Sequence, residues 1–351
     1  MRAGLVIYGD LDQATGGYLY DRMLVREMKE RGHRVEVISQ ERRDYLANLA
    51  DNLSPSMYRR LRDLEVDLLL EDELNHPSLF HLNDRLRAET SFPIVSIVHN
   101  LSRSVAMTEG ERGMCGFFES HYLATVDGFV FNSRATMESV LDLLPYLPKG
   151  VLAPPGKDHM TVGEGHRPSP PPMRLLFVGS VTPHKGLEVL VEALGLVGGD
   201  FTLDVVGPQS DPGYAERVKE RERVHGIEDR VRWLGPMGRE GIAHLLGGSH
   251  LLAVPSFHEG YGIVYVEALA HGVPVIATSF GGAKEIITNG REGFLVDPGD
   301  ARGLVNVLGR LMDHPDRLEG MGKMASERYL ELPTWRESMG RAVDFLETMV
   351  D

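Results

Sequence analysis

Short apolar runs that alternate with helical segments constrain the fold of this chain more than any other feature. Residues 5–8 (Leu-Val-Ile-Tyr) predict a buried strand, and residues 9–17 predict a loop rich in Gly and Asp. The helix expected next has one apolar face, made of Tyr20, Met23, Leu24 and Met28. A second strand is expected at residues 35–38. A strand, a helix and a strand in this order indicate parallel pairing with a right-handed crossover.

A proline-rich segment divides this alternation into two halves. Residues 163–172 read Gly-Glu-Gly-His-Arg-Pro-Ser-Pro-Pro-Pro, and consecutive prolines neither continue a helix nor donate hydrogen bonds to a sheet. Further apolar runs stand on both sides of it, at residues 66–70, 94–98, 128–131, 174–178, 201–206, 231–234, 251–254 and 274–278. The chain of 351 residues also exceeds the size at which one hydrophobic core usually keeps growing. A domain boundary is therefore expected at this segment.

We predict an α/β fold in which two Rossmann-like, doubly wound domains with parallel sheets face a central cleft. The first domain is expected over residues 1–165 and the second over residues 173–333. The last helix, expected over residues 334–351, has no sheet of its own to cover. We expect this helix to pack back against the first domain.

Composition and charge exclude several classes of protein. The formal net charge of −14 disfavours a general nucleic-acid binder, which needs a basic field to displace counterions from phosphates. Cys115 is the only cysteine, so the chain forms no intrachain disulfide and no cysteine-based metal cluster. Nowhere do 18 apolar residues run together, and the N-terminal apolar run is too short for a signal peptide. These features predict a cytoplasmic protein.

The most informative segment is residues 255–277. It begins where a strand is expected to end, turns through Gly260 and Gly262, and opens a helix. Ligands of open α/β sheets bind at this edge, beyond the carboxyl ends of the strands. We expect the backbone N–H groups of Ile263 and Val264 to present the positive end of the helix dipole to the cleft. Such a site suits a diphosphate.

Two carboxylates bracket the start of the same helix. Glu259 precedes it and Glu267 lies inside it, so both side chains can face one cleft from different depths. The alternative is a pair of solvated acids that are favoured by the helix dipole. Glu267 stands between Val266 and Ala268 in an apolar helix, where a charge without a partner is costly. A role in binding polyol hydroxyls is therefore favoured.

Residues 259–267 resemble the E-x7-E signature of glycosyltransferase family 4, whose members have the GT-B fold. The similarity extends along the chain to residues 16–17, 31–35, 131–133, 177–179, 183–186, 281–285 and 293–296. The resemblance implies a retaining glycosyltransferase that moves a hexosyl group from a nucleotide-diphosphate sugar to an acceptor hydroxyl, with no metal and no cofactor. It also implies that the first domain is the acceptor side and the second domain binds the donor. The leaving diphosphate would accept the proton of the acceptor hydroxyl.

Position by position, the resemblance implies that Glu259 contacts the sugar hydroxyls, Glu267 the ribose hydroxyls, and Lys185 the departing diphosphate. The donor-binding set implied in this way is Gly16, Gly17, Gly179, Ser180, Lys185, Glu259, Gly260, Tyr261, Gly262, Ile263, Val264 and Glu267. The catalytic set is His99, Lys185 and Glu259. Family members usually have an arginine where this chain has Ser180. His184 or another basic residue is a candidate to replace that charge.

Three residues of the first half match positions that approach the donor from the opposite wall. His99 follows the expected strand at residues 94–98 and matches the histidine that the family directs at the donor sugar. Its alternative role is structural. Gly16 and Gly17 match the N-terminal glycine loop of the family, and their alternative role is a tight turn before the helix.

No metal-ligating pattern is convincing. Asp10-Leu11-Asp12 imitates the D-x-D motif of a different glycosyltransferase fold, but in the first loop of a doubly wound domain these residues are expected to cap a turn. No two histidines have H-x3-H spacing, and Pro77 interrupts any helix that would present His76 and His81 together.

The sequence carries no readable code for the donor base (UDP, GDP or ADP), the sugar or the acceptor. The acceptor is a sugar, a lipid or a small molecule. Alternative functions are a nucleotide-sugar epimerase or a phosphorylase on the same fold, and a sugar-nucleotide-binding protein without catalysis. Peripheral contact with the inner face of a membrane also stays open, through a group of basic residues, Arg42, Arg43, Arg59, Arg60 and Arg62. Acidic neighbours dilute their charge and favour a solvated face instead.

Overall fold

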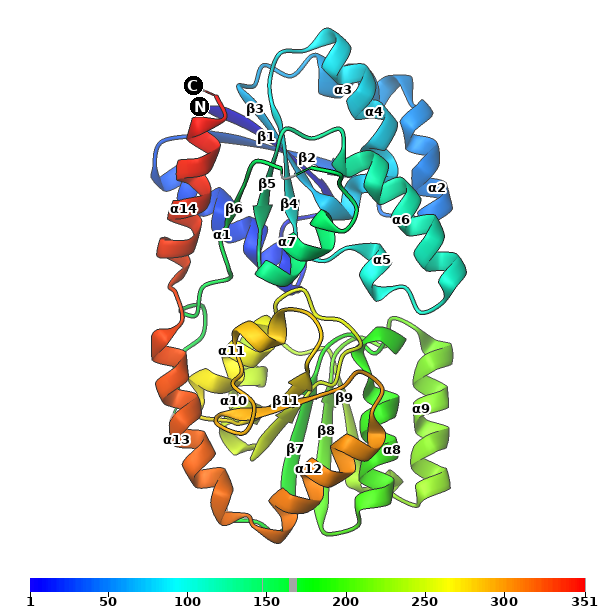
Figure 1. Ribbon diagram of the computed structural model, residues 1–351, viewed down its shortest axis with the longest axis vertical. Coiled ribbons are helices and arrows are strands. Elements are labelled where there is room, and N and C mark those ends of the chain that lie inside the picture. The colour runs from blue at the N-terminus through cyan, green and yellow to red at the C-terminus, as the bar shows by residue number, and fades with distance from the viewer. Residues whose placement is uncertain (147, 164–168, 351) are drawn as a thin grey trace. The chain divides into compact units, whose positions relative to one another are not determined.

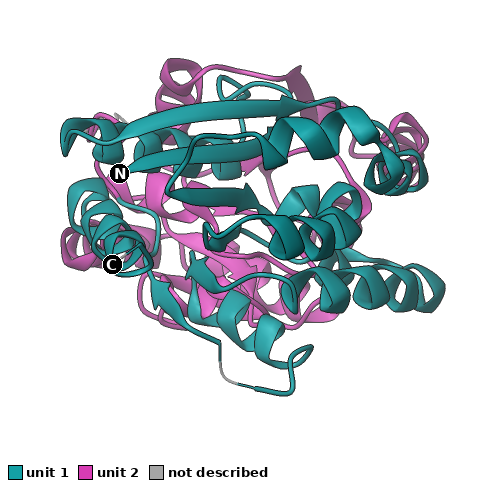
Figure 2. Ribbon diagram, turned by 90° about the horizontal axis from the view of Figure 1, so that it is seen from above, with its two compact units in different colours: residues 1–156, 333–351 teal, residues 157–332 magenta. Residues whose placement is uncertain are grey.

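The computed structural model describes residues 1–146, 148–163 and 169–350. It divides the chain into two compact units, which Figure 2 shows in different colours. The first unit comprises Met1–Gly156 and Pro333–Asp351, and the second comprises Lys157–Leu332. The chain thus passes from one unit to the other after Gly156, before the proline-rich segment where the sequence placed the boundary at residue 165. Residues 164–168 of that segment lie outside the described residues.

The first unit is built on a six-stranded parallel sheet with the strand order β2-β1-β3-β4-β5-β6. Its strands are β1 (Arg2–Tyr8), β2 (Arg34–Gln40), β3 (Leu68–Asp72), β4 (Ile94–Val98), β5 (Gly128–Phe131) and β6 (Gly150–Leu152). Its helices are α1 (Gly16–Glu30), α2 (Tyr45–Leu49), η1 (Ala50–Leu53), α3 (Pro55–Arg62), η2 (Glu73–Asn75), α4 (His76–Glu89), α5 (Ser102–Val105), α6 (Glu109–Leu123), α7 (Arg134–Leu141) and α14 (Trp335–Thr348).

The second unit repeats this architecture, with the strand order β12-β11-β10-β7-β8-β9 and parallel pairing throughout (Figure 1). Its strands are β7 (Met173–Val178), β8 (Phe201–Val206), β9 (Val231–Gly235), β10 (Leu251–Ala253), β11 (Val275–Thr278) and β12 (Gly293–Val296). Its helices are η3 (Pro183–Lys185), α8 (Leu187–Val197), α9 (Pro212–His225), η4 (Glu228–Arg230), α10 (Arg239–Gly248), α11 (Ile263–Ala270), η5 (Gly282–Glu285), α12 (Ala301–Asp313) and α13 (Asp316–Glu331). The two sheets confirm the predicted α/β fold with two Rossmann-like domains.

Local sequence explains where these elements begin and end. The central strands are continuous apolar runs because helices cover both faces of the sheets, and β4 is buried along its whole length. Helix α1 starts where the Thr15 hydroxyl accepts a hydrogen bond from the amide of Tyr18. It ends before Gly32, whose φ of 84° lies in the left-handed region that favours glycine.

Helix α14, at the C-terminal end of the chain, belongs to the first unit and packs on α1. Figure 1 shows the two helices side by side, in red and blue. Arg31 donates to Asp344 at 2.5 Å, and His33 Nε2 lies 2.8 Å from Glu347 Oε1. The Trp335 ring meets the Tyr20 ring edge to face, with centroids 5.9 Å apart. Polar and aromatic contacts therefore tie the two ends of the chain into one unit.

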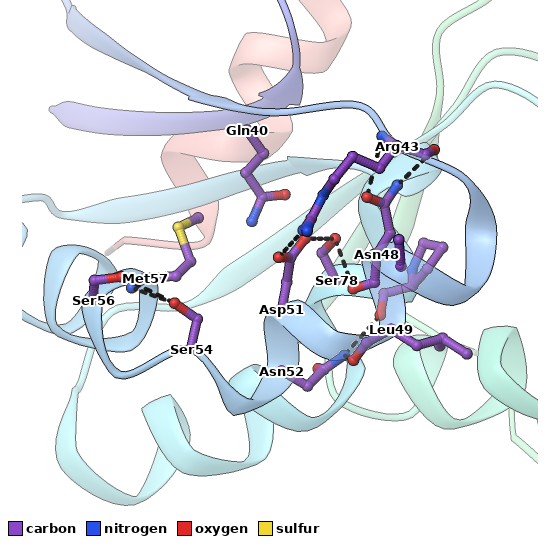
Figure 3. A network of polar contacts seen from close by, with 12 residues as sticks. Gln40, Arg43, Asn48, Leu49, Asp51, Asn52, Ser54, Ser56, Met57 and Ser78 are labelled. Atoms are coloured by element: carbon purple, nitrogen blue, oxygen red, sulfur yellow. Dashed lines mark hydrogen bonds and ion pairs between the residues drawn. The ribbon is translucent and has the colours of Figure 1, made fainter.

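Several of the arginines near α2 and α3 are engaged in contacts within the unit. Figure 3 shows Arg43, which donates to Asp51, and Ser78, whose Oγ donates to the same carboxylate at 2.8 Å. Arg62 pairs with Asp63 at 2.8 Å, and Arg60 donates to a backbone carbonyl of β2 at 3.3 Å. The two carboxylate contacts offset part of the positive charge that these arginines present to solvent. Among the described residues, no helix is both long and apolar enough to span a membrane.

Candidate functional site

In the second unit, the loop after β10 leads into α11 through Gly262, as the sequence predicted. Gly262 has a φ of 99°, and a Cβ added there would lie 2.3 Å from the ring of Tyr265. The position therefore requires glycine. The first-turn amides of α11, at Ile263 and Val264, have no partner within the helix. Such N–H groups at a helix N-terminus are the kind that can receive an anion.

Glu259, in the same loop, forms an ion pair with Lys185. Lys185 Nζ lies 2.7 Å from Glu259 Oε2, and the two side chains are 21% and 15% exposed. Ser256 Oγ donates to the same oxygen at 3.1 Å. Burial alone would raise the pKa of Glu259, but the Lys185 ammonium outweighs it and holds the pKa below its usual 4.5. Glu259 is therefore a carboxylate at neutral pH, and its cation is already in place.

The neighbouring strands β7 and β10 bring Lys185 and Glu259 together. Lys185 ends η3 in the loop after β7, and the amide of Phe257 in the loop after β10 donates to the carbonyl of His184 at 2.7 Å. Gly186 follows with a φ of 70°, and a Cβ there would lie 2.1 Å from the carbonyl oxygen of Pro255. The close approach of the two loops depends on this glycine. A Cβ added at Gly179 would lie 3.7 Å from Lys185 Cδ, which is an ordinary van der Waals distance. The stem of Lys185 would therefore not clash with a side chain at this position.

His184 does not replace the positive charge of the arginine that is usual at the position of Ser180. Burial is the main cause that lowers the pKa of His184 to about 4, and the nearby Lys185 ammonium lowers it further. The imidazole is therefore neutral at neutral pH, and its Nδ1 lies 3.2 Å from the hydroxyl of Thr182. Burial also lowers the pKa of His258. At a pKa of about 4, His184 supplies no second positive charge, and the alternative of another basic residue stays open.

Glu267 has the partner that its apolar helix demands. His159 Nε2 lies 2.9 Å from Glu267 Oε1, and the two side chains are 2% and 12% exposed. The two residues are 108 positions apart in the sequence, and no local pattern connects them. Sequence reasoning therefore missed His159. The contact with His159 fixes the Glu267 carboxylate, and both residues lie in the same unit as Lys185 and Glu259.

In the first unit, the structure brings Gly17 and His99 together. Gly16 and Gly17 open α1, and His99 follows β4. A Cβ added at Gly17 would lie 3.3 Å from His99 Cδ2, so the small residue lets the backbone lie against the imidazole. His99 Nε2 lies 3.0 Å from Asp21 Oδ1, also on α1. The start of α1, with Gly16 and Gly17, therefore lies next to His99 in this unit.

A cluster of buried carboxylates at the carboxyl end of β3 was not predicted from the sequence. Burial raises the pKa of Glu71 to about 7, of Asp72 to about 7, and of Glu73 and Glu119 to about 8. The Glu119 carboxylate accepts the amides of Ser102 and Arg103 at the start of α5. The run Glu71-Asp72-Glu73 is visible in the sequence, but such a run of acidic residues is compatible with an exposed position as well as with a buried one. Only burial distinguishes the two cases.

Two groups of buried side chains have the spacing of a metal site: Asp21, Asp72 and His99, and Glu73, His76 and Glu119. Hydrogen bonds compete with that use. His76 Nδ1 lies 3.1 Å from the carbonyl of Glu73, to which only a protonated nitrogen donates, and its Nε2 lies 2.9 Å from the Tyr45 hydroxyl. Asp10 accepts the amide of Asp12 at 2.8 Å, as a turn cap does.

Part of the chain, which lies within the second unit, is similar to a known protein family. Residues 165–328 match the family model described as "Glycosyl transferases group 1". The chain is 35% identical over 160 residues to the D-inositol 3-phosphate glycosyltransferase of Streptomyces scabiei. The aligned segment covers 43% of this chain and 36% of that protein. It therefore spans well under two thirds of that relative's length.

Two solved structures share the fold along the whole chain. Sucrose-phosphate synthase from Thermosynechococcus elongatus superposes with a TM-score of 0.82 at 20% identity, covering 99% of this chain and 98% of that one. HepE of Anabaena, in complex with UDP-glucose, superposes with a TM-score of 0.75 at 17% identity, covering 99% of this chain and all of that one. Residues 165–328 are thus similar to the group 1 glycosyl transferases, and the chain as a whole has the two-domain GT-B fold.

Proposed function

We propose that the protein is a retaining glycosyltransferase that transfers a hexosyl group from a nucleotide-diphosphate sugar to an acceptor hydroxyl, without a metal or another cofactor. The observation that carries the proposal lies within the second unit, where the free amides at the start of α11 follow a loop that holds the Lys185–Glu259 ion pair. An anion site, a cation and a carboxylate in one loop system match a sugar diphosphate, which has phosphates at one end and hydroxyls at the other.

Donor binding exchanges the contacts of Lys185 and Glu259. The ammonium turns to the diphosphate, and the carboxylate accepts hydrogen bonds from sugar hydroxyls. Both new contacts involve a charged group, so each is worth roughly 1.5–3 kcal/mol. They replace an ion pair that already shields both charges from the protein interior. The site therefore changes partners on binding without leaving a charge buried alone.

Glu267 is assigned to the ribose hydroxyls. One carboxylate oxygen is held by His159, and a carboxylate has lone pairs to accept further hydrogen bonds. UDP is the first nucleotide to test, because HepE of Anabaena has been solved with UDP-glucose. GDP and ADP sugars remain the alternatives. The acceptor is a sugar, a lipid or a small molecule with a free hydroxyl.

The transfer needs no protein nucleophile. Negative charge grows on the leaving diphosphate as the bond from the anomeric carbon to the diphosphate oxygen breaks, and Lys185 and the α11 amides stabilise that charge. The acceptor oxygen forms the new bond on the same face, and its proton passes to the departing diphosphate oxygen. Glu259 stays ionised throughout, because Lys185 lowers its pKa. His99 is assigned to the transferred sugar.

A sugar-nucleotide-binding protein without catalysis is the second candidate. Ser180 stands where an arginine is usual, and His184 is neutral, so Lys185 is the cation that the described loops after β7 and β10 offer. Loss of one cation weakens stabilisation of the leaving group more than it weakens binding of the donor. Turnover decides between the two candidates.

Thermal unfolding with UDP-, GDP- and ADP-glucose tests donor binding. One donor should stabilise the folded protein by about 2.7 kcal/mol at a hundredfold excess over its dissociation constant. Product formation with that donor, followed by ¹H NMR of the anomeric proton, tests transfer and its stereochemistry. An α-linked product from an α-linked donor supports retention, and a β-linked product contradicts it. Binding without transfer or donor hydrolysis would establish the second candidate.

A further inference from the structure

Asp21 and His99 form a buried pair in the first unit. The residues lie on α1 and directly after β4, 78 positions apart, with 3.0 Å between Asp21 Oδ1 and His99 Nε2. The Asp21 side chain is fully buried and that of His99 is 10% exposed. The Tyr20 ring meets the imidazole edge to face, with centroids 5.2 Å apart. Packing and a hydrogen bond thus fix the ring in one orientation.

The direction of this hydrogen bond follows from its acceptor. An ionised carboxylate only accepts, so Nε2 carries the hydrogen. The other ring nitrogen, Nδ1, forms no hydrogen bond with a described residue. It is therefore the atom of the ring that is available to a ligand.

The charged groups that act on His99 are acidic, and Asn132 after β5, which donates to its carbonyl, is uncharged. The acidic groups are Asp21 of α1, Asp72 at the end of β3 and Glu73 of η2, and the neighbouring Tyr20 and Gly17 of α1 are uncharged. Burial alone would lower the pKa of His99, but the carboxylates outweigh it, with Asp21 the strongest, and raise the pKa to about 9. An imidazole with this surrounding is an imidazolium at neutral pH.

We propose that Asp21 is a positioning residue that holds His99 as a hydrogen-bond donor at both ring nitrogens, so that Nδ1–H is offered to an oxygen of the transferred sugar. The inference rests on the proposed function, in which His99 meets the sugar. An imidazolium cannot accept the proton of the acceptor hydroxyl, so His99 does not act as a general base. That proton goes to the departing diphosphate.

The substitution Asp21→Asn separates charge from position. The amide oxygen of asparagine still accepts Nε2–H, so the ring keeps its orientation, but the negative charge is removed. The pKa of His99 should fall from about 9 toward the ordinary 6.5. At pH 8 the protonated fraction then falls by up to roughly thirtyfold, whereas at pH 6 the ring is protonated in both proteins. Asp21→Ala removes charge and acceptor together.

The first measurement is a histidine ring titration by NMR on the full chain. Asp21→Asn should move the His99 titration by more than one pH unit. The matched control is Glu347→Gln, which removes a carboxylate 2.8 Å from another histidine of the same unit, His33, and should leave the His99 titration unmoved. An unmoved His99 titration in folded Asp21→Asn overturns the inference, whatever the protein catalyses.

The second measurement is the pH profile of transfer. For Asp21→Asn, kcat should be close to that of the unsubstituted protein at pH 6 and reduced tenfold or more at pH 8, with affinity for the bare nucleoside diphosphate unchanged. Asp21→Ala should lose activity at both pH values. Equal losses at pH 6 and pH 8 for Asp21→Asn would show a purely structural role and overturn the inference. A shifted titration in a protein without any transfer would refute the proposed function and leave the effect of Asp21 on His99 standing.

Discussion

Replacing Lys185 by methionine tests the proposed stabilisation of the leaving group. Methionine keeps most of the length of the side chain and removes the charge that lies 2.7 Å from Glu259. Charge on the diphosphate grows toward the transition state, so the lysine contributes more there than in the ground state. Loss of one donor to a developing oxyanion lowers kcat by about 10²–10³, or roughly 3–4 kcal/mol. Lys185→Met should therefore lower kcat by this much and raise the donor KM by less.

The same substitution also affects folding, and the structure gives the size of that effect. Glu259 is 15% exposed, and without Lys185 it keeps only Ser256 among the side-chain partners described for its carboxylate. Breaking a buried ion pair by removing one partner costs about 3–5 kcal/mol. Rates must therefore be measured at a temperature where thermal unfolding shows the variant folded. Initial rates against donor concentration then give kcat and KM separately.

A matched control is Lys219→Met in the same unit. This lysine lies 5.2 Å from the centroid of the Trp233 ring and is outside the proposed site, so the control should leave kcat and KM unchanged. If KM for Lys185→Met rose as much as kcat fell, the lysine would bind ground state and transition state equally. That outcome, or full turnover in a folded variant, would refute the assigned role.

Other predictions address the nucleotide, the sugar, the metal and the buried acids. Glu267→Ala should weaken binding of the bare nucleoside diphosphate by roughly 1.5–3 kcal/mol in calorimetry, and unchanged affinity in a folded variant would remove it from the site. His99→Ala should reduce transfer but leave that affinity nearly unchanged, and a loss as large as that of Lys185→Met would contradict the assignment to the sugar. Transfer should survive EDTA; restoration by added Mn²⁺ or Mg²⁺ after inhibition would show metal dependence. The pKa values of Glu73 and Glu119, raised from 4.5 to about 8, mean that the folded protein keeps protons that the unfolded chain releases, so their stabilisation is present below pH 4.5 and lost as the pH rises through 8. Thermal unfolding should therefore show falling stability from pH 6 to pH 9, with a smaller slope in Glu73→Gln, and an unchanged slope would contradict the burial of these acids.

Local sequence was enough for the elements that carry the proposed donor site. The strand before Pro255, the turn at Gly262 and the start of α11 were predicted because apolar runs and glycine spacing act within a few residues along the chain. The two parallel sheets followed from the same alternation. The assignment of residues to nucleotide, sugar and diphosphate came from the resemblance to a family, and the experiments above are its test.

The sequence by itself thus determined the order of the elements and the residue types at the carboxyl ends of the strands. The tertiary structure decided which of those side chains meet. Lys185 with Glu259, His159 with Glu267, and Asp21 with His99 are 74, 108 and 78 residues apart, and only the pairing of strands and helices sets such contacts. It also decided charge, since burial lowers the pKa of His184, while the neighbouring Asp21 carboxylate is the main cause that raises the pKa of His99. A pKa depends on the dielectric and the charges within a few ångströms, and these are properties of the folded chain and not of the order of its residues.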